Sequence, residues 1–217
     1  MQRPAHAFIF DLDGTLADTM PSHYVAWTKV AARHGLTFPE ARFYSLGGVP
    51  TAKIAAMLIT EAGLTLDPQV IALEKEQTYY DGLGPGGIVA IEPVLALARG
   101  HRERNEGPLA VASGSVRRLV SRTLAALGIT DWFAAVVAAE DTTRHKPEPD
   151  VFLEAARRVN AEPATCTVYE DTDIGLEAAR RAGMHPVDVR LLIAAAKTAA
   201  KTASMTAAET ATTKPSV

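Results

Sequence analysis

The chain has 217 residues, of which 47% are hydrophobic and 22% charged, and its formal net charge is −3. This composition is that of a globular protein long enough for one sizeable core and a smaller inserted unit. It contains no long basic stripe and no apolar run close to the ~18 residues of a membrane span, which argues against nucleic acid or a membrane as partner and favours a small molecule.

A short apolar run near the N-terminus ends in two carboxylates. Residues 8–10 read Phe-Ile-Phe, and Asp11, Leu12, Asp13 and Gly14 follow. This pattern is typical of a buried parallel strand, and open α/β sheets bind ligands just beyond the carboxyl ends of such strands. Because the chain begins to coil there, both aspartates can turn toward one point, where a hard cation such as Mg²⁺ would relieve their repulsion.

Residues 17–83 have helical rather than strand periodicity, and we expect them to form a helical insert. The apolar spacing predicts one helix from about Pro21 to His34, a second from Thr51 and a third over 67–81. Glycine and proline dominate residues 82–87, a composition typical of a hinge or linker.

From residue 92 onward the pattern alternates between helices and strands, which is the signature of a doubly wound parallel sheet. We expect an α/β fold in which residues 1–16 and 84–193 form a Rossmann-like core and residues 17–83 an inserted α-helical cap. The further predicted strands are 109–112, 135–139, 165–169 and 186–189, and the predicted helices are 92–104, one from 116, one from 150, and 172–182.

Polar side chains follow the later strands as well. Since the carboxyl ends of parallel strands share one edge of the sheet, these side chains can meet in one pocket with the two N-terminal aspartates. Charged and hydroxyl groups of this kind suit phosphoryl transfer. The residues concerned are Ser113 and Gly114, Lys146, and Glu170 with Asp171.

Each residue type has a role in such a site. A cation held by Asp11, Asp171 and Glu170 would bridge to the phosphoryl group. The Lys146 ammonium, the Ser113 hydroxyl and nearby backbone N–H groups would form its cradle, which the backbone can approach closely at Gly114.

Two carboxylates would carry the chemistry. Asp11 can act as nucleophile and form an aspartyl-phosphate, which splits one difficult displacement into two easier ones. Asp13, two residues further on, is placed to protonate the leaving alkoxide and then to deprotonate the attacking water.

With these motifs the chain resembles the haloacid dehalogenase superfamily of phosphohydrolases over roughly residues 5–190. The resemblance implies that Asp11 is nucleophile and Mg²⁺ ligand, and that Asp13 is acid and base with its backbone carbonyl on the metal. Thr15 is grouped with the phosphate-binding residues and would help to fix the loop. The matching motifs, in family order, are Asp11-Leu-Asp13-Gly-Thr15, Ser113-Gly-Ser115, Lys146-Pro147 and Glu170-Asp171-x-Asp173.

The insert is similar to the β-phosphoglucomutase-like group, and most of all to its fructose-1-phosphatase type. The segment from Asp18 through His23 to Trp27 carries this likeness. It implies that His23, on the first cap helix, contacts Asp13 or the substrate when the cap is shut. Lys75, on the third predicted cap helix, is a further candidate for contact with the substrate.

Three functions remain open at this point. The favoured one is a Mg²⁺-dependent phosphatase acting on a small phosphorylated sugar resembling fructose 1-phosphate. A mutase of the same group would hold a second phosphate with a Lys and an Arg, where this chain has Gly47 and Thr51. An idle binding or regulatory protein of the same fold is opposed by the presence of every catalytic residue.

The remaining predictions concern location, assembly and the C-terminus. Cys166 is the single cysteine, which excludes an internal disulfide. Without a signal-like segment at the start, we expect a cytoplasmic protein, and we take a monomer as the default. Residues 194–217 contain nine Ala, six Thr and three Lys, so we expect this tail to be disordered or a frayed helix.

Overall fold

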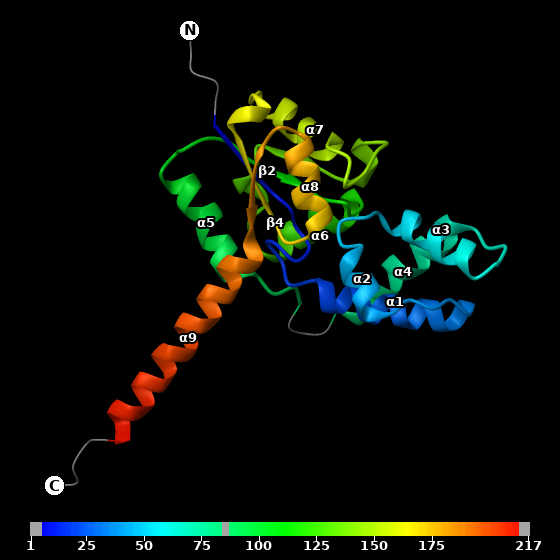
Figure 1. Ribbon diagram of the computed structural model, residues 1–217, viewed down its shortest axis with the longest axis horizontal. Helices are drawn as coiled ribbons and strands as arrows, with labels where there is room; N and C mark the ends of the chain where they lie inside the picture. The colour runs from blue at the N-terminus through cyan, green and yellow to red at the C-terminus, as the bar shows by residue number, and fades with distance from the viewer. Residues whose placement is uncertain (1–5, 84–86, 213–217) are drawn as a thin grey trace.

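The computed structural model describes residues 6–83 and 87–212, with side chains as far as residue 202, and consists of a sheet-based core and a helical cap (Figure 1). In the described residues the sheet has five parallel strands in the order β3-β2-β1-β4-β5. The carboxyl ends of these strands therefore face one edge. The strands are β1 (Ala7–Phe10), β2 (Leu109–Ala112), β3 (Ala135–Val137), β4 (Cys166–Glu170) and β5 (His185–Asp188).

The central strand β1 shows why the sheet needs cover on both faces. All four of its residues are buried, and successive side chains enter opposite layers: Ile9 joins one apolar cluster, whereas Phe8 and Phe10 join the other. The first layer is closed by α7 (Asp150–Arg158) and α8 (Asp173–Arg181). The second is closed by α5 (Glu92–Glu103) and α6 (Arg117–Ala126). The predicted doubly wound α/β fold is confirmed.

The cap lies to one side of the sheet's carboxyl edge (Figure 1). It has its own apolar core, built around Trp27, Phe38 and Phe43. Its second helix was not predicted from the sequence, because it is only six residues long and buries Phe43 alone, so it has no helical apolar period. The cap helices are α1 (Met20–His34), α2 (Glu40–Ser45), α3 (Thr51–Glu61) and α4 (Pro68–Gly82).

The C-terminal segment is a helix, α9 (Val189–Thr212), that leaves the core beside α5 and extends away from the body (Figure 1). Its first residue, Val189, is buried in the core. Alanine has the highest helix propensity, so the composition of the segment favours a helix over disorder. Through residue 212 the segment has the helical form that was one of the two alternatives for the tail, and its disorder stays an untested prediction.

Parts of the predicted domain division lie outside the described residues, namely residues 1–5, the linker residues 84–86 and the end of the tail from 213. The boundaries at 16/17 and 83/84 stay predictions. Within the described part of the chain, no helix combines the length and hydropathy that a membrane crossing requires.

Candidate active site

Three carboxylates meet at the carboxyl edge of the two central strands. Asp11 follows β1, Glu170 ends the adjacent β4, and Asp171 comes next, with Phe10 paired to Tyr169 in the register. One oxygen of each carboxylate lies within 4.8 Å of the others. Strand pairing thus joins residues that are 160 positions apart in the sequence.

Lys146 lies inside this cluster. Its ammonium Nζ donates to Asp11 Oδ1 and to Glu170 Oε2, both at 2.7 Å, and its side chain is only 1% exposed. Burial opposes the charge of Lys146, but the two carboxylates hold its pKa above the usual range. Lys146 therefore remains a cation throughout the neutral range.

One ammonium does not balance three carboxylates. Burial, reinforced by the charge of Glu170, raises the pKa of Asp171 to about 7 and that of Asp11 well above its usual value. Among the described residues, these three are the group of acidic ligands with metal-binding spacing. Oxygen donors with an excess negative charge fit a divalent cation such as Mg²⁺.

The carboxylates are held in place by short contacts. Glu170 Oε1 accepts from the Thr172 backbone N–H at 2.9 Å and from the Thr172 hydroxyl at 2.7 Å. Asp171 Oδ1 accepts from the Thr15 hydroxyl at 2.8 Å. Gly14 has φ +88°, and a Cβ there would lie 2.3 Å from Asp171 Oδ2, so this turn requires glycine.

Asp13 occupies a different environment. Its Oδ1 accepts from the Thr19 hydroxyl at 2.6 Å and its Oδ2 from the Ser115 hydroxyl at 2.7 Å, while His23 Nε2 lies 3.4 Å from Oδ1. Burial alone would raise the pKa of Asp13, but His23 and the two hydroxyl groups hold it well below the usual range. The pKa values of Asp11 and Asp13 are thus shifted in opposite directions.

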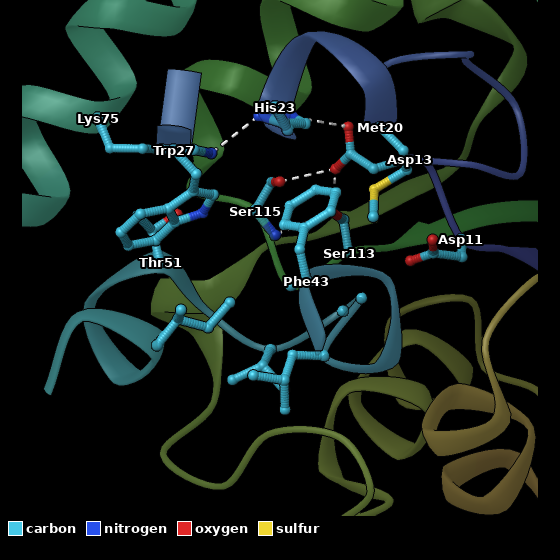
Figure 2. A pocket seen from close by; sticks show the side chains of 16 residues that line it. Asp11, Asp13, Met20, His23, Trp27, Phe43, Thr51, Lys75, Ser113 and Ser115 are labelled. Carbon is cyan, nitrogen blue, oxygen red and sulfur yellow. Dashed lines mark hydrogen bonds and ion pairs between the residues drawn. The ribbon is translucent and has the colours of Figure 1, made fainter. Parts of the chain in front are cut away.

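His23 links Asp13 to Lys75 (Figure 2). Lys75 Nζ lies 2.8 Å from His23 Nδ1, and the His23 ring stacks on Tyr79 with centroids 3.9 Å apart. Burial lowers the pKa of Lys75 to about 8, and burial together with Lys75 lowers the pKa of His23. A neutral His23 accepts from Lys75 at Nδ1 and donates from Nε2 to Asp13.

We expect Lys75→Met to change how stability depends on pH. Because the folded pKa of Lys75 is about 8 and the unfolded value 10.5, the unfolded chain binds more protons between these values. The free energy of unfolding of the wild type should therefore rise across pH 8 to 10.5 relative to the variant, by up to about 3 kcal/mol. Urea unfolding at both pH values measures the difference. The exposed Lys29→Met is the control, and a pH-independent difference would contradict the burial of a charged Lys75.

Asp11 of the carboxylate cluster, together with Asp13, His23 and Lys75, borders one cavity between cap and core, with a volume of about 50 Å³ (Figure 2). Ligand sites for metabolites usually occupy about 300–1,000 Å³, so the cap must separate from the core to admit one. The cap loop is packed directly on the core: a Cβ on Gly114 would lie 2.1 Å from the Gly48 carbonyl oxygen. The cavity is lined by Asp11, Asp13, His23, Lys75, Ser113, Gly114, Ser115 and Thr51, together with the apolar Met20, Trp27, Phe43, Leu46, Val49 and Ile54 and with Gly47 and Gly48.

The structure brings the predicted site residues together in two neighbouring groups. Asp11, Asp13, Ser113, Gly114, His23 and Lys75 line the cavity, and Lys146, Glu170, Asp171 and Thr15 lie in or against the carboxylate cluster.

Asp173, which the resemblance placed in support of the metal site, pairs instead with Arg190 at 2.7 Å on the surface. Sequence reasoning assigned no chemistry to Thr19 or Thr172, although both hydroxyl groups stand close to acidic motifs and contact their carboxylates.

A parallel sheet with a carboxylate–lysine cluster at its carboxyl edge and a helical cap over that edge defines a class of capped α/β enzymes. Residues 5–183 match the family model of the haloacid dehalogenase-like hydrolases, and the chain belongs to this family. The predicted superfamily is thereby confirmed.

The chain is also similar to individual named proteins. The chain is 40% identical over 184 residues to the fructose-1-phosphate phosphatase YqaB of Escherichia coli strain K12, covering 85% of this chain and 96% of the relative. It is 32% identical to hexitol phosphatase A of the same organism, covering 84% and 82%. Among solved structures, the β-phosphoglucomutase of Clostridium difficile is similar with a TM-score of 0.74 and 28% identity, covering 85% and 84% of the two chains.

Proposed function

We propose that the protein is a Mg²⁺-dependent phosphatase that hydrolyses a small phosphorylated sugar, resembling fructose 1-phosphate, through an aspartyl-phosphate intermediate. The observation that carries this proposal is the position of Asp11, which belongs to the buried carboxylate–lysine cluster and also lines the cavity under the cap. The 40% identity to a fructose-1-phosphate phosphatase supports the substrate class.

Asp11 is the nucleophile in this scheme. Its Oδ1 is hydrogen-bonded to Lys146, which leaves the second carboxylate oxygen to attack phosphorus. The Ser113 hydroxyl and the backbone at Gly114, both on the cavity wall, bind the phosphoryl oxygens. Mg²⁺ held by Asp11, Asp171 and Glu170, with the Asp13 backbone carbonyl, would supply positive charge for the phosphoryl group as a Lewis acid.

Asp13 transfers the protons. With the cap closed, its hydrogen bonds keep it ionised, so it must lose some of these partners when the substrate enters in order to donate a proton to the leaving alkoxide. His23 is mounted on cap helix α1, so opening and closing of the cap changes its contact with Asp13. The acid function of Asp13 is thus coupled to the cap, and its base function follows when water attacks the aspartyl-phosphate.

Asp13→Asn should lower kcat by about 10²–10⁴-fold, the usual range for loss of a general acid–base. The amide can keep hydrogen bonds to Thr19 and Ser115 but cannot exchange a proton, so the fold should persist. Steady-state kinetics gives the effect. The matched control is Asp18→Asn, an exposed carboxylate on the same segment, and wild-type turnover by Asp13→Asn would remove the assigned role.

A mutase is the second candidate, because a named β-phosphoglucomutase shares the fold at 28% identity. A mutase must grip a bisphosphate at both ends. Of the described residues that line the cavity, Lys75 is the one lysine or arginine, and it is engaged by His23, while Gly47 and Thr51 supply no charge. This favours hydrolysis.

Product analysis tests the proposal against the mutase. The wild type is incubated with fructose 1-phosphate and with β-glucose 1-phosphate in Mg²⁺, and phosphate and sugar phosphates are separated. Free phosphate and free sugar are the expected products. Conversion of the 1-phosphate to a 6-phosphate without release of phosphate would favour the mutase, and the absence of either product would favour the binding-protein alternative.

A further inference from the structure

Helix α9 begins at Val189, after the last residue matched by the family model, residue 183. It forms one wall of a second cavity of about 510 Å³, against the segment that joins β1 to the cap, the start of α5, and Met20, Pro21 and Tyr44 of the cap helices. Ala196 and Lys197 line it from α9, and Gly14 and Asp18 line it from the opposite side. This chain therefore has a cavity that is formed in part by an element outside the family match.

This second cavity reaches the carboxylate cluster from behind. Asp171 lines it, whereas Asp11 and Asp13 line the cavity under the cap. The cluster thus lies between two cavities. The cavity under the cap has a volume of only about 50 Å³ and is covered by the cap loop, which rests on Gly114. With the cap closed, the α9 cavity remains as an approach to the metal ligands.

The charge along the α9 cavity suits a cation. Asp18 and Glu92 are exposed carboxylates on its wall, Asp171 also lines it, and Lys197 lines it from α9. Most of the lining residues are apolar, and the charged ones are three carboxylates and one ammonium. An excess of one sign of charge between low-dielectric walls concentrates ions of the opposite sign.

We propose that the α9 cavity is the passage by which the divalent cation reaches and leaves Asp171 while the cap is closed, with α9 as its wall. The inference rests on the metal site proposed above. It separates the exchange of the metal from the exchange of the sugar phosphate, which uses the cap side. Ala196 and Lys197 are then residues that set the rate of metal exchange and not the affinity of the site.

Metal exchange in the full-length protein tests this passage, with Mn²⁺ as the probe. Stopped-flow mixing gives the association rate, mixing of the loaded protein with an excess of chelator gives the release rate, and calorimetry gives Kd. Ala196→Trp fills the passage and should slow association and release by the same factor, several-fold, with Kd unchanged. The control is Ala195→Trp on the exposed side of the same helix.

A second variant tests the passage by changing its charge, and it does not require a bulky side chain to fit. Lys197→Glu should speed Mn²⁺ association by roughly threefold at low ionic strength, and added salt should reduce the gain. Lys201→Glu makes the same charge change at an exposed position off the cavity wall and should have a smaller effect.

The Mn²⁺ measurements distinguish failure of the proposed passage from failure of the proposed metal site. If the wild type binds Mn²⁺ but Ala196→Trp exchanges it at the wild-type rate, the passage is overturned and the proposed site stands. A change of Kd in Ala196→Trp with an unchanged association rate would also overturn it. Failure of the wild type to bind Mn²⁺ at all would overturn both.

Discussion

Asp11→Asn is expected to lower the rate of phosphate release by roughly 10⁴-fold or more, the scale seen when a catalytic nucleophile is removed. The amide cannot attack phosphorus and removes one carboxylate from the cluster. The fold should persist, because the two side chains are nearly the same size and Lys146 keeps its hydrogen bond to Glu170. Phosphate release at saturating sugar phosphate, with circular dichroism as the check on folding, measures the effect.

The control for Asp11→Asn is a carboxylate of the same region with no part in the proposed chemistry. Asp173 is exposed and pairs with Arg190, so Asp173→Asn should turn over at the wild-type rate. If Asp11→Asn were folded and kept its activity, the aspartyl-phosphate route would be wrong.

Lys146→Met is expected to cause the largest loss of stability, about 3–5 kcal/mol in the absence of metal, since it leaves buried carboxylates without their cation. The side chains of Asp11 and Glu170 would each lose a 2.7 Å ion pair while almost wholly buried. Urea unfolding at neutral pH with a chelator present measures the loss, and the exposed Lys53→Met should change stability by no more than about 0.5 kcal/mol.

The loss of stability in Lys146→Met, measured against the wild type, should depend on pH. Asp11 and Asp171 already have raised pKa values in the folded protein, the latter about 7, and removal of the ammonium raises them further. A group with a raised folded pKa destabilises the fold above that pKa and not below its unfolded value. Relative to the wild type, the variant should therefore recover stability as the pH falls from the alkaline side toward about 7, and a loss of stability that grew on acidification would contradict this electrostatic account.

The main features of the fold and site could be predicted from the sequence because the site residues stand directly after the apolar runs that form the strands. An apolar run ending in Asp11 and another ending in Glu170 imply neighbouring carboxylates once the sheet is parallel. The alternation of helical and strand patterns along the sequence also predicted the order of the elements. The predicted strands 135–139 and 165–169 differ from β3 and β4 by two residues or fewer at each end.

The contacts of the cap could not be predicted in this way. The hydrogen bond between His23 and Lys75 joins α1 to α4, and it depends on how two amphipathic helices are rotated against each other. The hydroxyl groups of Thr19 and Ser115 on Asp13 depend on side-chain rotamers in turns, which no periodicity encodes. The α9 cavity could not be predicted from the sequence, because it depends on where α9 leaves the core.

The most direct test of the proposed function is phosphate release from fructose 1-phosphate by the wild type, with Mg²⁺ titrated into metal-free enzyme. The proposal predicts no release without Mg²⁺, saturable release as Mg²⁺ is added, and release from Asp11→Asn that is slower by roughly 10⁴-fold or more at every Mg²⁺ concentration. Release that is equally fast in an excess of chelator, or that persists at the wild-type rate in Asp11→Asn, would contradict it.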